Sequence, residues 1–510
     1  MKRALISVYD KTGIIEFVEN LVQMDWEIIS TGGTYRLLSE NGIKVKEVDE
    51  ITKFPEILDG RVKTLNPRIH GGILFQRDNE EHRRVIEELG IFPIHMVVNN
   101  LYPFEETVKK DGVTLEDAIE NIDIGGPSMI RAAAKNFQDV TVVIDPVDYN
   151  QVLLELKQNG DTKPETRLEL ARKVFNYTAY YDALIANYFN DLCQETFPQY
   201  LTLPYKKRDQ LRYGENPHQK AAFYSDYNQT EGTISGAKQL HGKELSFNNI
   251  NDSNGAISII KEFQEPAAIA VKHGNPCGAG IGNDIVEAFE KAYESDTESI
   301  FGGIIALNRE VTLKLAERLS KIFLEIIIAP SFSEEALELL KEKKNIRLLQ
   351  ISEIMDTHYT KPMAKQVEGG MLYQERNKEL LQNDMEIVTE RFPEEDELDD
   401  MVFAWKIAKH ISSNGVVIVK NGATLGIGLG EVNRFWAVQK AVERAGVEAK
   451  GAVLASDGFF PFKDSIEALA KAGIEAVIQP GGSVRDSEVV KEADMNQMSM
   501  VFTGMRHFRH

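Results

Sequence analysis

Short apolar runs alternate with amphipathic segments through the first 145 residues, and this alternation restricts the fold more than any other feature of the chain. Residues 4–8 (ALISV) have the pattern of a buried strand, and the apolar residues between positions 14 and 22 fall on one face of a helix. Three further strands are predicted at 27–30 (EIIS), 96–100 (MVVNN) and 140–145 (VTVVID). Strands that alternate with helices are typical of a parallel sheet. We therefore predict an α/β fold with a parallel sheet at the N-terminus.

The chain divides into two predicted domains. Helical periodicity is lost around residues 195–210, where two prolines stand, so we place a boundary near residue 198 and expect domains at 1–198 and 199–510. In the second domain, residues 267–307 and 451–482 run through similar series of strand, turn and helix. This order predicts a duplicated α/β unit, although no residue-by-residue repeat supports it strongly. The charge run PEEDELDD predicts the solvated start of a helix.

Composition excludes several classes of function. The net charge of −21 argues against a nucleic-acid or membrane-surface partner, so an anionic ligand must be met by local basic groups or backbone N–H groups. Two cysteines, Cys193 and Cys277, are too few for a disulfide framework or a multi-thiolate metal site. The first apolar stretch is too short for a signal peptide, and no run approaches ~18 apolar residues. We expect a cytoplasmic protein with no membrane partner.

Polar and basic residues gather where the strands of the first domain are predicted to end. The stretch STGGT (30–34) opens a helix after a strand, and its backbone N–H groups could hold a phosphate. The stretch RVKTLNPRIHGG (61–72) concentrates positive charge, with a solvated basic loop as the alternative. Tyr102 stands at a strand end, where α/β sites are built, and Asp123 precedes a Gly-Gly turn. Pro127 suits the first position of a helix, and Lys135 lies about two helical turns after it. A packed aromatic and a surface lysine are the alternatives for Tyr102 and Lys135.

Together with SVYDKTG at positions 7–13, these motifs closely resemble the IMP cyclohydrolase domain of the bifunctional purine-biosynthesis family over most of residues 1–198. The resemblance implies a Rossmann-like, methylglyoxal-synthase-like domain. It also implies ring closure of formyl-AICAR to IMP with loss of water. One departure is Asn66, where the family usually has His in a Thr-Leu-His-Pro string, so a family role for that His would be compromised here.

The resemblance implies four catalytic residues in this domain. Lys63 and Tyr102 would polarise or protonate the formyl oxygen. Asp123 would accept a proton from the carboxamide nitrogen, and Lys135 would keep Asp123 ionised or act itself as an acid. The expected substrate-binding residues are Ser30, Thr31, Gly32, Gly33, Thr34, Arg61 and Thr64.

The stretch AVKHGNPCGAG places Lys272 and His273 side by side at the end of a predicted strand, against a tight turn. A solvated pair in a loop is the alternative. The following Pro-Cys pair suggests the zinc ligands of nucleoside deaminases. The second cysteine position is Gly280, however, and the other cysteine lies in the first domain. A zinc site needs three good N or S ligands and only one is present, so we expect no catalytic metal.

With LRYGENPHQ (211–219), GKELSFNNIND (242–252), SDGFFPFKDS (456–465) and RHFRH (506–510), this stretch resembles the AICAR transformylase of the same family over nearly all of residues 199–510. The resemblance implies a cytidine-deaminase-like duplicated α/β domain. Its reaction transfers a formyl group from 10-formyltetrahydrofolate, the cosubstrate, to the 5-amino group of AICAR.

In this reaction an aromatic amine attacks the formyl carbon and must lose a proton. We assign the proton transfer to His273, because histidine is the side chain that most readily takes up and releases protons at working pH. Lys272 would lower the pKa of His273 and donate to the oxyanion or to the leaving folate nitrogen. Asn414 would orient the formyl group or His273. The substrate contacts implied by the resemblance are Arg212, Tyr213, Arg506 and His510 for the nucleotide, Phe459 in the pocket wall, and Asp464 for the carboxamide or the pterin.

The expected partners are therefore small molecules: AICAR, formyl-AICAR and the folate. The resemblance also implies a homodimer, and the net charge argues against a nucleic-acid partner. Two alternatives remain open. A nucleotide-responsive binding protein would lack acid–base residues, whereas Lys63, Tyr102, Lys272 and His273 are all present. A zinc-free enzyme acting on another imidazole or pyrimidine nucleotide is less favoured, because both domains match the family.

Overall fold

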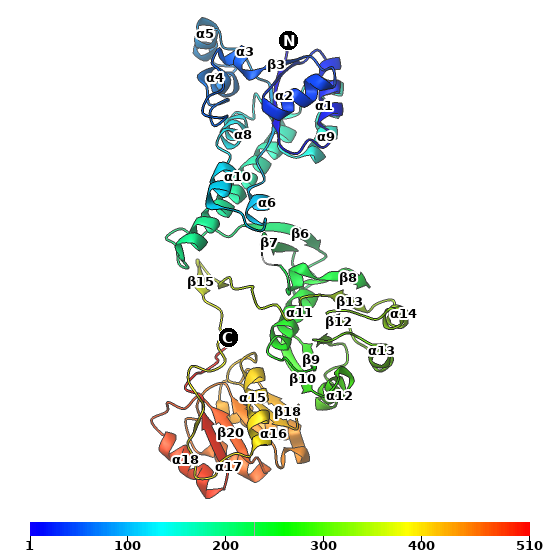
Figure 1. Cartoon of the computed structure of the whole chain (residues 1–510), viewed down its shortest axis with the longest axis vertical. Helices are drawn as coiled ribbons and strands as arrows, with labels where there is room; N and C mark the ends of the chain where they lie inside the picture. The colour runs from blue at the N-terminus through cyan, green and yellow to red at the C-terminus, as the bar shows by residue number, and fades with distance from the viewer. Residues whose placement is uncertain (229) are drawn as a thin grey trace. The chain divides into compact units, whose positions relative to one another are not determined.

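The computed structural model describes residues 1–228 and 230–510, which form two compact units, Met1–Tyr205 and Lys206–His510 (Figure 1). The boundary predicted near residue 198 falls between the last helix of the first unit, which ends at Cys193, and the strand that begins at Tyr205.

The first unit contains one five-stranded sheet of order β3-β2-β1-β4-β5. All four strand pairings are parallel, which confirms the predicted parallel sheet. The order reverses between β1 and β4, and ligand sites of open α/β sheets lie at the carboxyl ends of the strands beside such a reversal. The elements of this unit are β1 (Arg3–Val8), α1 (Ile14–Gln23), β2 (Glu27–Ser30), α2 (Gly32–Glu40), β3 (Val45–Glu47), α3 (Val48–Thr52), α4 (Pro67–Leu74), α5 (Glu80–Glu88), β4 (Met96–Asn100), α6 (Phe104–Val108), α7 (Leu115–Glu120), α8 (Gly125–Lys135), β5 (Thr141–Val143), η1 (Pro146–Asp148), α9 (Tyr149–Asn159) and α10 (Pro164–Cys193).

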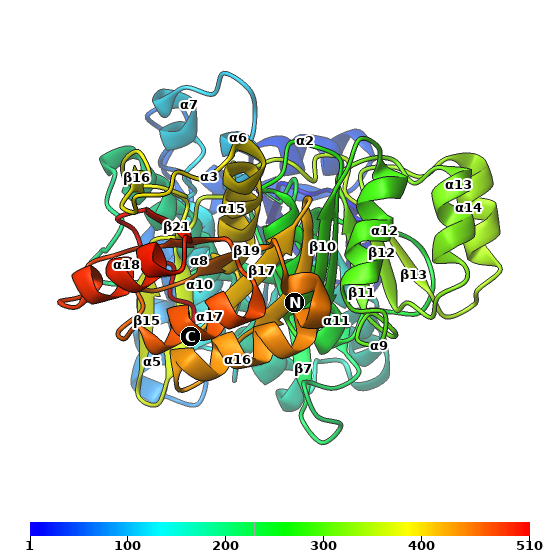
Figure 2. The ribbon, with the colours of Figure 1, turned by 90° about the horizontal axis from the view of Figure 1, so that it is seen from below.

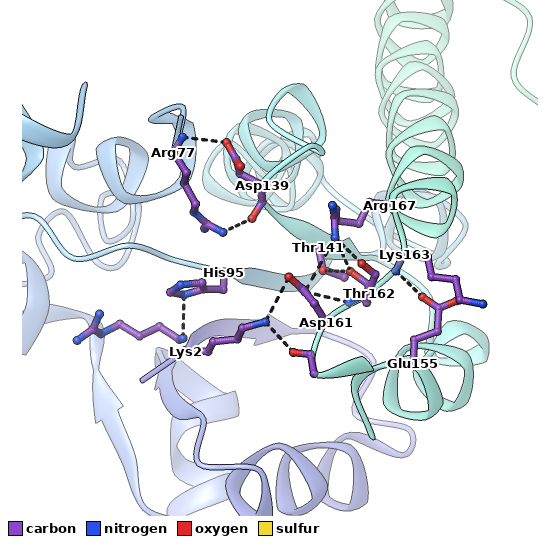
Figure 3. A network of polar contacts seen from close by, with 12 residues as sticks. Lys2, Arg77, His95, Asp139, Thr141, Glu155, Asp161, Thr162, Lys163 and Arg167 are labelled. Carbon is purple, nitrogen blue, oxygen red and sulfur yellow. Dashed lines mark hydrogen bonds and ion pairs between the residues drawn. The ribbon is translucent and has the colours of Figure 1, made fainter. Parts of the chain in front are cut away.

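A polar network closes the amino-terminal edge of this sheet (Figure 3). The backbone N–H of Arg3 donates to Nδ1 of His95 at 3.1 Å, and Lys2 Nζ lies 3.3 Å from the carboxylate of Asp161. Burial, with the nearby charges of Arg77, Lys2 and Arg3, lowers the pKa of His95 to about 4. His95 is therefore neutral and accepts a hydrogen bond, and we assign it a structural role.

The second unit is built on a twelve-stranded sheet of order β16-β21-β20-β19-β17-β18-β10-β9-β11-β12-β13-β8, with two small sheets, β6-β7 and β14-β15. Figure 2 shows part of the large sheet, with β11, β12 and β13 side by side. The elements are β6 (Tyr205–Leu211), β7 (Ala221–Asp226), η2 (Ile234–Gly236), β8 (Lys238–His241), α11 (Phe247–Ile260), β9 (Ala267–Lys272), β10 (Asn275–Ile281), α12 (Ile285–Ser295), β11 (Ile304–Leu307), α13 (Leu313–Leu319), β12 (Ile326–Ala329), α14 (Glu334–Lys341), β13 (Arg347–Gln350), β14 (Met363–Val367), β15 (Gly370–Gln374), β16 (Glu386–Ile387), α15 (Glu395–Ala408), β17 (Val416–Lys420), β18 (Ala423–Gly428), α16 (Arg434–Ala445), η3 (Gly446–Ala449), β19 (Val453–Ser456), α17 (Asp464–Ala472), β20 (Ala476–Gln479), α18 (Asp486–Met495) and β21 (Ser499–Phe502).

The predicted duplication is confirmed. The series α11-β9-β10-α12-β11-α13-β12-α14-β13 recurs as α15-β17-β18-α16-β19-α17-β20-α18-β21, and β10 pairs antiparallel with β18 where the two halves meet. A residue-level repeat is also present: VKHGNPCGAG at 271–280 and VKNGATLGIG at 419–428 share Val-Lys and three glycines. The alignment of 267–307 with 451–482 was wrong, because the hairpin of the first repeat has its counterpart at 416–428.

The large sheet is the middle of three layers. Helices α11 and α15 cover one face, where alternate strand residues such as Ile269, Val271 and Val417 join a single apolar cluster. On the other face, α12–α14 cover the first repeat and α16–α18 the second. Because strand side chains alternate between faces, both faces of each central strand are apolar.

Candidate active sites

The first candidate site lies at the carboxyl ends of β1, β2 and β4. Oδ1 of Asn100 accepts from the backbone N–H groups of Tyr9 at 2.6 Å and Asp10 at 2.9 Å, which ties the end of β4 to the loop after β1. Tyr102 is 47% exposed, and its ring meets that of Tyr9 edge to face at 6.2 Å. Two accessible phenol rings therefore border the point where the strand order reverses.

Asp123 is held by backbone groups at the start of α8. Its Oδ1 accepts from the N–H of Gly126 at 2.8 Å, and its carboxylate also accepts from the backbone N–H of Tyr102. Its own N–H donates to the hydroxyl oxygen of Tyr181 at 2.9 Å. Burial raises the pKa of Asp123, and the hydrogen bonds to its carboxylate oppose that rise. A fixed, partly desolvated carboxylate with a raised pKa suits a general base.

Lys63 and Thr64 are adjacent residues that lie beside the starts of two different helices. A Cβ built on Gly32 would lie 3.8 Å from Lys63 Nζ, and one built on Gly125 would lie 2.9 Å from Thr64 Oγ1. Lys63 therefore stands beside the start of α2, where it pairs with Glu56 at 3.1 Å, and Thr64 stands beside the start of α8.

Arg61 and Asn66, which flank Lys63 and Thr64, have partners of their own. Arg61 is exposed and forms an ion pair with Glu120. Asn66 caps α4 by accepting from the N–H of Arg68 at 2.9 Å, and Asn is among the best N-cap residues. The change from the family His thus has a structural use.

In STGGT, the side chains of Ser30 and Thr34 are not directed to a ligand. The hydroxyl of Ser30 is fully buried and donates to the carbonyl of Ile6 at 2.7 Å, and Thr34 Oγ1 accepts from the N–H of Val8 at 3.0 Å. Both side chains hold β1. The groups left to bind an anion are the backbone N–H groups at the start of α2. Thr31 is the N-cap there, makes no side-chain capping bond, and precedes Gly32 and Gly33.

Lys11 lies beside the start of α2 and was missed by the sequence analysis. A Cβ built on Gly33 would lie 4.0 Å from Lys11 Cε, and the ammonium group donates to the carbonyl of Val8 at 2.7 Å. Burial lowers the pKa of Lys11, with the charge of Asp10 opposing. The only signal was its place in the SVYDKTG motif.

Lys135 is not brought to Asp123 within one chain. It is the last residue of α8, whereas Asp123 contacts the first turn of that helix. Lys135 follows Gly125 by ten positions in α8, which corresponds to about 15 Å along the axis. The predicted pairing of Lys135 with Asp123 therefore fails on distance in this unit.

The second candidate site begins with the turn between β9 and β10. Lys272 pairs with Asn275 across the hairpin, so His273 and Gly274 form a two-residue turn, with φ of 53° and 72°. Positive φ at both positions is the type I′ geometry that suits such hairpins. His273 is exposed, and its N–H donates to Oδ2 of Asp252 at 3.1 Å.

Lys272 Nζ donates to the carbonyl of Phe301 at 2.8 Å. At the equivalent position of the second repeat, Lys420 Nζ donates to the carbonyl of Lys450 at 2.7 Å. Because both repeats keep this bond, it belongs to the fold. The role of Lys272 toward an oxyanion stays a prediction.

A cavity of about 430 Å³ opens in the second repeat of this unit. Three of the predicted residues, Asn414, Phe459 and Asp464, contribute to its wall. The full lining is Asn414, Val432, Asn433, Arg434, Phe435, Phe459, Pro461, Phe462, Asp464, Ser465 and Phe508.

Arg434 holds polar residues in and next to the cavity wall in place, and the sequence analysis did not identify it. It is buried, its Nη2 donates to Oδ1 of Asn414 at 2.8 Å, and its Nη1 donates to Ser456 at 2.8 Å and forms an ion pair with buried Asp457. Asn414 Nδ2 donates to the carbonyl of Glu431 at 2.8 Å. The Asn414 carboxamide is thus oriented at both ends. No local pattern marks an arginine at a helix start as buried.

The terminal residues reach the cavity through Phe508. The guanidinium of Arg506 lies 4.6 Å from the centre of the Phe508 ring, and the ring of His510 meets it at 5.7 Å. Arg212 and Tyr213 follow β6 and contact each other at 5.5 Å. Among the described residues, these two are not in the cavity wall.

The His273 turn and the cavity lie at the same edge of the large sheet. β10 starts after the turn and runs antiparallel to β18, which ends shortly before Val432 and Asn433 in the cavity wall. Ser412 Oγ donates to Oδ1 of Asn275 at 3.2 Å, which links the loop before Asn414 to the residue after the turn.

Cys277 is a poor metal ligand in this setting. Burial, with the charge of Asp296, raises the pKa of its thiol to about 12, so the thiolate is disfavoured. Within residues 1–228 and 230–510, no group of three or more His, Cys, Asp or Glu side chains is placed to hold a metal ion. The helices described there include none with the length and apolar character to cross a membrane.

Two family models match the chain. Residues 13–128 match the MGS-like domain, and residues 133–444, more than half of the chain, match the AICARFT/IMPCHase bienzyme. Both agree with the resemblance stated from the motifs. Among solved structures, the crystal structure of ForH covers 37% of this chain and 98% of its own, at 38% identity and a TM-score of 0.34, which is too low to support a conclusion.

Several curated relatives match along their whole length. The bifunctional purine biosynthesis protein PurH of Thermoanaerobacter sp. is 57% identical over 510 residues, covering 100% of both chains. The proteins of the same name from Caldicellulosiruptor saccharolyticus and Bacillus cereus are 55% and 56% identical, again over 100% of both chains. The chain therefore belongs to the AICARFT/IMPCHase bienzyme family of purine biosynthesis.

Proposed function

We propose that this chain catalyses two consecutive steps of IMP synthesis. Residues 206–510 transfer a formyl group from 10-formyltetrahydrofolate to the 5-amino group of AICAR, and residues 1–205 close formyl-AICAR to IMP with loss of water. The observation that carries the proposal is the position of the His273 turn and the cavity walled by Asn414 at one edge of the sheet. A base and an oriented carboxamide at one edge suit acyl transfer to an amine.

In formyl transfer, the amine nitrogen of AICAR bonds to the formyl carbon and gives its proton to His273. The carbonyl oxygen carries negative charge until the bond to the folate nitrogen breaks and that nitrogen takes a proton. Asn414 has a second amide hydrogen beyond the one it donates to Glu431, and this hydrogen would steady the oxygen. Arg434 keeps the carboxamide from rotating.

In ring closure, the carboxamide nitrogen of formyl-AICAR bonds to the formyl carbon. Asp123 takes a proton from that nitrogen, and burial supports this role because it raises the pKa of the carboxyl and makes the carboxylate a stronger base than a solvated one. Lys63 and Tyr102 supply two protons to the formyl oxygen, whose bond to carbon breaks so that it leaves as water. The formamido nitrogen loses its own proton as the C=N bond of the new ring forms, and this proton and the one taken by Asp123 restore Lys63 and Tyr102 through solvent. We give Lys135 no part in this step within one chain, because α8 separates it from Asp123.

The phosphate of the nucleotide would bind the first unit at the start of α2, through the backbone of Thr31, Gly32 and Gly33. Lys11 and Lys63 would supply positive charge, and their positions beside this helix start support the assignment. In the second unit, Arg506 and His510 would meet the nucleotide next to Phe508. The roles of Arg212 and Tyr213 are proposed on the resemblance alone.

We further propose that no metal takes part, because the thiol of Cys277 favours its protonated form and Gly280 stands where a second cysteine would be needed. A homodimer is part of the same proposal. The hairpin β14-β15 supports it, since Met371 and Leu372 are 46% and 60% exposed on a two-stranded sheet. The cytoplasmic location predicted from the sequence also belongs to this proposal.

The test uses the purified full-length protein. Incubation with AICAR and 10-formyltetrahydrofolate should yield IMP, and incubation with formyl-AICAR alone should yield IMP without folate. Both activities should survive exhaustive chelation. Absence of IMP from both reactions would refute the proposed function, and loss of activity with one tightly bound zinc per chain would refute the metal-free mechanism.

A further inference from the structure

The turn that carries His273 is held by a carboxylate from the helix that precedes it. Asp252 lies on α11, and its carboxylate accepts from the backbone N–H groups of His273, at 3.1 Å, and Gly274. Consecutive N–H groups in left-handed residues form a concave donor pair that suits an anion. The side chain of Asp252 thus binds the turn through its backbone and leaves the imidazole of His273 exposed.

The second repeat contains the same arrangement without a histidine. Asp400 lies on α15, and its carboxylate accepts from the N–H groups of Asn421 at 2.6 Å and Gly422 at 2.7 Å. The φ angles of Asn421 and Gly422 are 56° and 68°, close to those of the first turn. The carboxylate is therefore an inherited part of the hairpin in both repeats.

The two turns differ in the residue at the first left-handed position. Asn is one of the non-glycine residues that adopts this conformation most readily, and it occupies the turn at 421. At 273 the same position holds a histidine, which the turn itself does not need. Asp252 and Asp400 each bind the backbone of a hairpin turn. Only the turn bound by Asp252 contains a residue, His273, to which we assign a catalytic role.

We propose that Asp252 is a positioning residue for formyl transfer: its carboxylate holds the His273–Gly274 turn and thereby sets where the imidazole meets the substrate amine. Asp252 acts through the backbone of His273 and does not touch the substrate. This inference rests on the proposed function of the second unit.

The two repeats supply a matched pair of variants. In full-length protein, Asp252→Asn and Asp400→Asn each leave one oxygen to accept from a turn and place an amide NH₂ where the other oxygen stood. Asp252→Asn should lower kcat for formyl transfer by about tenfold or more, because a displaced catalytic group loses alignment. The KM for AICAR should stay unchanged. Asp400→Asn should leave kcat unchanged, and both variants should lower Tm by similar amounts.

Two further variants separate a loss of activity from a loss of folding. Asp252→Glu keeps both carboxylate oxygens on a longer side chain and should recover part of the lost kcat, which also covers the case in which Asp252→Asn folds poorly. His273→Asn copies the turn of the second repeat and should retain the wild-type Tm but lose formyl transfer. Ring closure of formyl-AICAR should be unchanged in all four variants.

Wild-type kcat in Asp252→Asn, or equal losses of kcat in Asp252→Asn and Asp400→Asn, would overturn the inference. A rise in the KM for AICAR that accounts for the whole effect would also overturn it, because it would indicate a binding role. Failure of the proposed function gives a different result, since the wild-type protein itself would then form no formyl-AICAR.

Discussion

Replacing Gly126 by alanine should disable ring closure by displacing Asp123. A Cβ at position 126 would lie 2.9 Å from Cγ of Asp123 and 2.8 Å from Cδ2 of Leu101, whereas ordinary contacts begin at 3.4 Å. The carboxyl carbon must therefore retreat by about half an ångström, and the nearer oxygen by more. Since a misplacement of about 1 Å can cost 10²-fold in rate, we expect kcat for ring closure to fall by about 10–100-fold.

The assay follows conversion of formyl-AICAR to IMP by full-length Gly126→Ala, with formyl transfer by the same protein as an internal control. Alanine has a higher helix propensity than glycine, by about 1 kcal/mol, so unfolding of α8 is not the expected cause of any loss. Formyl transfer should be unchanged, because His273 lies in the other unit. Ring closure at the wild-type rate would refute the view that Asp123 must stay where the start of α8 holds it.

Three other changes test separate parts of the account. His273→Ala should lower the rate of formyl transfer by at least ~10²-fold and leave ring closure near wild type, and near-full transfer would count against the assignment. The pKa of His95 is about 4 in the folded protein against 6.5 for an unperturbed histidine, so the unfolded chain takes up the proton first as pH falls. The free energy of unfolding should therefore decrease as pH falls from 6.5 toward 4. In urea unfolding at pH 7 and pH 5, His95→Gln should show a smaller decrease than the wild type, and an identical decrease in the two proteins would contradict this role of His95. Asp457→Ala should lower the free energy of unfolding by about 3–5 kcal/mol, because it leaves the buried charge of Arg434 without its partner, and a denaturant midpoint equal to that of the wild type would show that the pair is dispensable.

The parallel sheet of the first unit could be predicted because its signal is local. Each strand is a short apolar run, each helix has one apolar face, and the two periods differ. The duplication in the second unit was harder to align, since an apolar strand followed by a helix looks alike wherever it occurs. The two hairpins correspond through Gly274 and Gly422, both of which have positive φ, and this correspondence depends on strand pairing.

The partner of a polar side chain could not be predicted from the sequence. Ser30 and Thr34 fit a phosphate loop, yet their hydroxyls bind the backbone of β1. The charge run at 393–400 does start a helix, but the carboxylate of its last residue, Asp400, accepts a hydrogen bond from the turn after β17. Spacing along a chain fixes the face of a helix or strand, whereas these contacts depend on which strand lies alongside.

Ring closure illustrates the same limit. Asp123 could be singled out as a candidate base from its place before a Gly-Gly turn, but the distance between Asp123 and Lys135 follows from where α8 begins and ends. The importance of Arg434 depends on three groups contributed by separate segments. Neither feature has a signal within a single stretch of sequence.

The most direct test of the central claim, that one chain carries two separable active sites, mixes two full-length variants that each lack one site. With AICAR and 10-formyltetrahydrofolate, His273→Ala alone should form formyl-AICAR at least ~10²-fold more slowly than the wild type, and Asp123→Asn alone should form formyl-AICAR but little IMP. An equimolar mixture should produce IMP, because the intermediate made by one variant is closed by the other. IMP from Asp123→Asn alone at the wild-type rate, or no IMP from the mixture of two folded variants, would contradict the account.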